Sequence, residues 1–172
     1  KELTMDAQEL MVAENKEEQR SIWYQAIEEG ERRANVVLGP LLEDHLVTTL
    51  RSYVLDRNLC RVVARDFLSH FLYTNSETLI SVAGRCLIIT GFFPDISRRR
   101  NVREGYFIET GVGAYNAHAS YWSAHGNRNY AKCSRNAAER FLDLVKTLRG
   151  MRNSRVVAEE IEALSVPELH WH

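Results

Sequence analysis

Apolar residues recur every three or four positions along most of this chain, the spacing that places them on one face of an α-helix. The clearest stretches are residues 41–54 and 59–72, where Leu, Val, Phe and Tyr return with this period. Residues 79–89 are apolar on nearly every side apart from Arg85, so we expect them to form the central helix. No alternating strand pattern interrupts the series. The pattern predicts an all-α fold, a single-domain helical bundle of six to eight helices.

Glycine, proline and capping residues divide the pattern into elements. Pro40 suits the first turn of a helix, and the run Thr74-Asn75-Ser76-Glu77 has the spacing of a capping box. Asn101 is expected to cap a helix from residue 102 to about residue 124, whose many Gly and Ala residues predict close packing against another helix or a kink. Gly150 is expected to end the helix that precedes it.

The two ends of the chain are expected to differ from its centre. Residues 1–172 are predicted to form one domain. Within it, residues 1–35 have a weak apolar stripe with a fully polar run at 15–20, which indicates one long helix or two helices with a break, semi-detached from the bundle. Residues 165–172 have no periodicity and are predicted to be a tail.

Composition narrows the class of protein. The chain has 172 residues, of which 45% are hydrophobic and 26% charged, and this is ordinary for a globular domain. Its three cysteines have no CxxC spacing, which favours a reducing compartment. The N-terminus has no apolar run typical of a signal peptide, and no apolar stretch is long enough to span a bilayer. We therefore expect a cytoplasmic protein without a membrane partner.

Charge is distributed unevenly along the chain. Residues 1–31 contain nine acidic and three basic side chains, whereas residues 98–155 contain twelve basic and four acidic ones. Four of the basic residues gather where one predicted helix follows another: Arg98, Arg99, Arg100 and Arg103. Clustered guanidinium groups bind carboxylates and phosphates well. We predict partner or anion binding there, most readily of an acidic protein; the alternatives are internal pairing with acidic residues of this chain and binding of nucleic acid.

A second candidate site lies on the predicted Gly-rich helix. Helical spacing places four of its side chains on one face: Phe107, Tyr115, His118 and Trp122. This face either lines a pocket with one titratable group or is an aromatic core stripe with a hydrogen-bonded histidine. His45 and His70 lie near apolar faces of other helices, where three histidines could meet at a metal or haem. No HxxxH or HExxH spacing requires this, so we predict neither metal nor cofactor.

The sequence contains no recognisable catalytic motif. It has no phosphate-binding loop, no GxSxG sequence and no paired carboxylates at a spacing suited to acid–base chemistry, so no catalytic residue is predicted. We expect a non-enzymatic regulatory or protein–protein interaction module that uses its basic helix junction. The alternative is a helical pocket protein or enzyme that binds a small ligand, metal or haem, and the third is a nucleic-acid-binding protein. Both a monomer and a homodimer are compatible with the sequence.

One segment resembles known proteins. It contains Phe93-Pro94, then Arg98-Arg99-Arg100-Asn101-Val102, Tyr106-Phe107, Gly111 and Ala114-Tyr115. This string of about 25 residues resembles a segment of small, uncharacterised bacterial helical proteins. The resemblance implies a bacterial cytosolic setting and implies no activity.

Overall fold

The computed structural model describes residues 7–53, 75–96, 101–103, 105–154 and 157, with the backbone alone for residues 7–19. Within this part of the chain there are six helices and no strand. They are α1 (Ala7–Ala34), α2 (Pro40–Tyr53), α4 (Ser76–Phe92), α6 (Tyr106–Ala124), α7 (Arg128–Glu139) and α8 (Phe141–Met151). The predicted all-α helical bundle is therefore confirmed.

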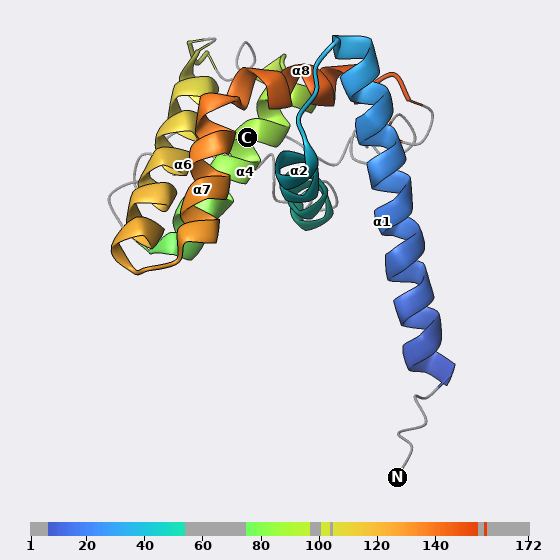
Figure 1. Ribbon diagram of the computed structural model, residues 1–172. Helices are drawn as coiled ribbons and strands as arrows, with labels where there is room; N and C mark the ends of the chain where they lie inside the picture. The colour runs from blue at the N-terminus through green and yellow to red at the C-terminus, as the bar shows by residue number, and fades with distance from the viewer. Residues whose placement is uncertain (1–6, 54–74, 97–100, 104, 155–156, 158–172) are drawn as a thin grey trace.

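The centre of the bundle is α4, as the apolar pattern of residues 79–89 predicted. Nearly every side chain from Leu79 to Phe92 on this helix is buried. Helices α6 and α8 pack directly on α4, while α7 covers α6 and α1 covers α8. Figure 1 shows α6 and α7 side by side as a hairpin, with α8 crossing near one end of the bundle and α1 on the far side from the hairpin.

The first helix is continuous, so the chain has one long helix here and not two. Trp23, Ala26 and Ile27 bury its C-terminal half against the core, and its N-terminal end extends past the other helices (Figure 1). The semi-detached character expected for residues 1–35 stays a prediction, and the expected tail at 165–172 lies outside the described residues. Among the helices described, none is long and apolar enough to cross a membrane.

Two glycines mark where α1 and α8 cross. A Cβ atom added at Gly150 would lie 2.6 Å from the backbone oxygen of Gly30, and one added at Gly30 would lie 2.5 Å from the backbone oxygen of Thr147. Helix α8 ends at Met151, one residue after the Gly150 at which the sequence predicted a helix end. The helix expected before Gly150 is interrupted at Arg140, between α7 and α8. The predicted close packing of the Gly-rich helix occurs at Gly111, where an added Cβ atom would lie 2.7 Å from the ring of Phe141 and 3.0 Å from Cβ of Cys86.

Two predicted caps also need correction. The N-cap of α4 is Asn75, one residue later than the capping box suggested, and its side chain accepts a hydrogen bond from the backbone N–H of Thr78 at 2.7 Å. Asn101 caps no helix, because it occupies a turn with φ of 51°. Helix α6 begins later, after Gly105, and has no side-chain cap. Asn readily adopts this left-handed conformation, so the same residue type suits a turn and a cap.

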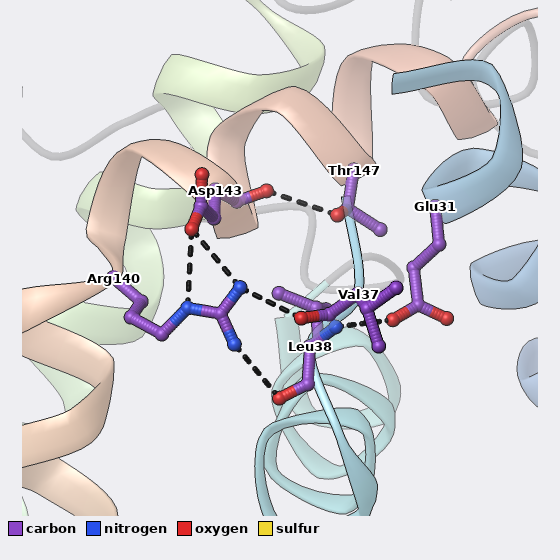
Figure 2. A network of polar contacts seen from close by, with 6 residues as sticks. All are labelled: Glu31, Val37, Leu38, Arg140, Asp143 and Thr147. Carbon is purple, nitrogen blue, oxygen red and sulfur yellow. Dashed lines mark hydrogen bonds and ion pairs between the residues drawn. The ribbon is translucent and has the colours of Figure 1, made fainter. Parts of the chain in front are cut away.

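A polar network holds the α1–α2 connection against the α7–α8 junction (Figure 2). Arg140 donates to the carbonyl oxygens of Val37 at 2.7 Å and Leu38 at 3.0 Å, and to the carboxylate of Asp143 at 3.0 and 3.1 Å. The backbone N–H of Leu38 donates in turn to Glu31 at 2.6 Å. A planar guanidinium can satisfy several acceptors at once. The network thereby ties the backbone just before α2 to the end of α1 and the start of α8.

Candidate functional site

A cavity of about 560 Å³ opens between α2 and the ends of α4, α6 and α7. Its exposed wall is mainly apolar, with polar groups distributed around it. The described residues that line it are Leu41, Asp44, His45, Thr48, Thr49 and Ser52 from α2; Ser76, Glu77 and Ile80 from α4; His118 and Trp122 from α6; and Asn129, Tyr130, Cys133 and Ser134 from α7. Ligand pockets in proteins commonly have a volume of about 300–1,000 Å³ and mainly apolar walls.

Helix α2 contributes a whole face to this cavity, since its lining residues recur every three or four positions. Three hydroxyl groups on this face donate to backbone carbonyls one turn earlier. Thr48 donates to Asp44 at 3.0 Å, Thr49 to His45 at 2.8 Å, and Ser52 to Thr48 at 2.9 Å. A hydroxyl has a single proton, so these three groups present oxygen lone pairs to an occupant.

The hydrogen bonds of His118 determine its tautomer. The indole N–H of Trp122, which can only donate, lies 3.1 Å from Nε2 of His118. Burial lowers the pKa of His118, so the ring is neutral near pH 7. Its Nε2 must then accept, and its proton lies on Nδ1, which donates to Oγ of Ser134 at 2.7 Å. Both ring nitrogens of His118 are thus used within the protein.

His45 is the second histidine of the cavity wall. Its Nε2 lies 2.7 Å from the hydroxyl of Tyr115, and its ring meets the Tyr115 ring edge-on. Burial lowers the pKa of His45 to about 4, with a smaller contribution from the nearby His118. Both imidazoles are therefore neutral at physiological pH, and neither places a positive charge in the cavity.

The structure separates the four residues predicted to share a pocket face. His118 and Trp122 line the cavity, and Tyr115 lies behind its wall, fully buried and bonded to His45. Phe107 lies about two turns before Tyr115 on α6, is buried in the core and does not line the cavity. Sequence reasoning missed the α2 face, although the polar residues at positions 44, 48 and 52 recur every four positions, the spacing of one helix face.

The polar groups of the cavity are not arranged for nucleophilic catalysis. A base that activates a serine must accept the serine proton, but the nitrogen of His118 that faces Ser134 already carries a proton. Ser134 itself is only 2% exposed. Burial raises the pKa of the Cys133 thiol, which makes the reactive thiolate scarcer. Neither Ser134 nor Cys133 is therefore activated as a nucleophile by the described groups of the wall.

None of the other sequence candidates is among the described residues that line this cavity. Arg98, Arg99 and Arg100 lie outside the described residues, as does His70. Arg103 pairs with Glu109, and both side chains are largely exposed. Among the residues that the structure describes, no three His, Cys, Asp or Glu side chains are grouped so as to hold a metal ion.

Comparison of the chain with protein-family models, curated proteins and solved structures finds no match.

Proposed function

We propose that this protein binds a small organic molecule in the cavity between α2, α4, α6 and α7. The observation that carries this proposal is the combination of a volume of about 560 Å³, mainly apolar walls and polar groups from four helices. An apolar wall favours burial of a ligand by about 25 cal/mol for each Å² removed from water, and a few polar groups set its orientation.

The surroundings of the cavity support a binding role. Its walls come from helices, which hold side chains more rigidly than loops do. His45 and His118 are anchored by Tyr115, Ser134 and Trp122, so an occupant would meet fixed groups. Fixed groups lose little conformational entropy when a ligand binds.

The proposal is tested by screening small molecules by ligand-observed NMR against the wild type and two tryptophan variants. Thr48→Trp fills the cavity from an exposed lining position of α2. Arg51→Trp places the same side chain on the same helix at an exposed position that does not line the cavity. Compounds retained by the wild type and Arg51→Trp but lost from Thr48→Trp support the proposal. No retained compound, or equal retention by all three proteins, overturns it.

The partner-binding role expected for Arg98, Arg99, Arg100 and Arg103 stays a prediction, as does binding of nucleic acid by the basic half of the chain. The lone described member of that group, Arg103, is paired with Glu109.

A further inference from the structure

We propose that the ligand of the cavity is an organic cation, an ammonium group on an apolar body. This assignment rests on the proposed function and adds the chemical class of the occupant. Three properties of the wall favour it: the sign of its charges, the excess of hydrogen-bond acceptors on α2, and two aromatic rings set at an angle.

The charged groups of the described wall are both acidic. Asp44 and Glu77 line the cavity, and no Lys or Arg is found among the described lining residues. The histidines add no positive charge, since both are neutral near pH 7. Among the described residues, Arg20 forms an ion pair with Asp44 at 4.0 Å, but both side chains are more than half exposed and their attraction is screened by water. Glu77 forms no ion pair with the described residues.

Helix α2 adds acceptors to this acidic wall. Thr48, Thr49 and Ser52 each donate their hydroxyl proton to a backbone carbonyl, so the exposed oxygens of Thr48 and Ser52 present lone pairs to an occupant. The hydroxyl of Tyr24 already donates to Asp44, and it orients that carboxylate. The positive charge of an ammonium group, with or without N–H donors, complements this surface of oxygen lone pairs and carboxylates, whereas a carboxylate or phosphate would meet lone pairs and negative charge.

Trp122 and Tyr130 supply the aromatic part of the wall. Their ring centroids lie 5.3 Å apart, and the rings are inclined by 59°, so they form a corner. Both rings belong to the cavity wall, and Tyr130 is 56% exposed. Aromatic faces attract cations through the ring quadrupole, with Trp the strongest, and such corners suit alkylated ammonium groups.

The opposite charge preference has one argument in its favour, because the first turns of α4 and α7 border the cavity and helix N-termini attract anions. Glu77 lies in the first turn of α4 and already supplies that negative charge. The side chains of Asn75 and Asn127 accept from first-turn amides of α4 and α7. The first-turn N–H groups of α4 and α7 are therefore partly satisfied within the protein. The acidic groups and acceptors of the wall then favour a cation over an anion.

Three probes of similar shape decide the matter: benzyltrimethylammonium, its neutral carbon isostere neopentylbenzene, and the anion phenylacetate. Dissociation constants are measured by NMR titration at low salt. We expect the cation to bind about tenfold more tightly than the isostere, and phenylacetate to bind most weakly. Glu77→Gln should raise the dissociation constant of the cation about threefold. The control Glu139→Gln removes an equal charge at an exposed position of α7 outside the cavity and should leave the affinity unchanged.

Each other outcome overturns the cation assignment. Equal or tighter binding of neopentylbenzene, lost in Thr48→Trp, shows an apolar cavity without charge preference and leaves the proposed function standing. Preference for phenylacetate shows that the helix N-termini dominate. Equal weakening by Glu77→Gln and Glu139→Gln shows that only the overall charge matters. If none of the three probes binds, the cation assignment fails, whereas the screen with the Trp variants decides separately whether the cavity binds any ligand.

Discussion

The indole N–H of Trp122 donates a hydrogen bond to Nε2 of His118 across 3.1 Å, one turn apart on α6. Because an indole has no acceptor, this bond places the imidazole proton on Nδ1 and aims it at Ser134. A serine–histidine pair that resembles a catalytic dyad by composition is thereby oriented with the opposite polarity. Side chains of the cavity wall are thus held in place by hydrogen bonds to one another.

Removing this donor should change the titration of His118. Trp122→Phe keeps an aromatic ring but deletes the N–H that favours the neutral imidazole, so the pKa of His118 should rise toward its ordinary value. Long-range ¹H–¹⁵N spectra of the imidazole, recorded as a function of pH, report both the tautomer and the pKa. Tyr130→Phe, which removes a neighbouring hydroxyl, should leave both unchanged. A wild-type spectrum with the proton on Nε2 would contradict the assignment.

The sequence predicted the helices better than the cavity, for a physical reason. The apolar period of residues 79–89 and the position of Pro40 reflect local rules, and both predictions hold. The same rules are ambiguous for Gly150 and Asn101, because a glycine suits a helix end and a helix crossing equally, and Asn suits a cap and a turn. Only the positions of other elements decide between these roles.

The cavity depends on contacts between residues far apart in the sequence. His118 needs Ser134 from another helix to orient it, and the backbone just before α2 is bonded at Leu38 to Arg140, more than a hundred residues later. Spacing within one helix could place His118 and Trp122 on one face. It could not show that Phe107 lies in the core instead of the cavity wall.

The Arg140 network should contribute measurably to stability. Arg140→Ala leaves the carbonyls of Val37 and Leu38 without their donor, and we expect a loss of about 2 kcal/mol in the free energy of unfolding. Arg140→Lys keeps the charge but not the fork of donors, so it should recover only part of that loss. Urea denaturation measures both. Arg135→Ala, an exposed change on α7, should stay within about 0.5 kcal/mol of the wild type; an equal effect of the two Ala variants would argue against the network.

The crossing of α1 and α8 should be intolerant of a single methyl group. Ala exceeds Gly in helix propensity by about 1 kcal/mol, but the added Cβ of Gly150→Ala would lie 2.6 Å from the backbone oxygen of Gly30. Backbone atoms cannot rotate away, so the helices must separate and lose packing, and we expect a net loss of about 1–3 kcal/mol.

Gly105→Ala, at the N-cap of α6, is a control for an added methyl group that meets no backbone atom, and it is measured by the same urea denaturation. The nearest atom to its added Cβ is a side-chain oxygen at 3.6 Å, an ordinary contact. Its effect should remain within about 0.5 kcal/mol. A Gly150→Ala protein as stable as the wild type would show that the two helices are free to move apart at no cost.

His45 should make the stability depend on pH below neutrality. Its pKa is about 4 in the folded protein and about 6.5 in the unfolded chain, so the unfolded chain binds more protons between these values. The contribution of neutral His45 to the free energy of unfolding is complete above about pH 6.5 and is lost as the pH falls toward 4. Its upper limit is about 3 kcal/mol. His45→Gln retains a polar group beside Tyr115 without a titrating ring, while Asp44 and His118 remain in both proteins. The difference in unfolding free energy between wild type and variant should therefore shrink as the pH is lowered from 7 to 4. A constant difference across that range would show that His45 titrates alike in the folded and unfolded states.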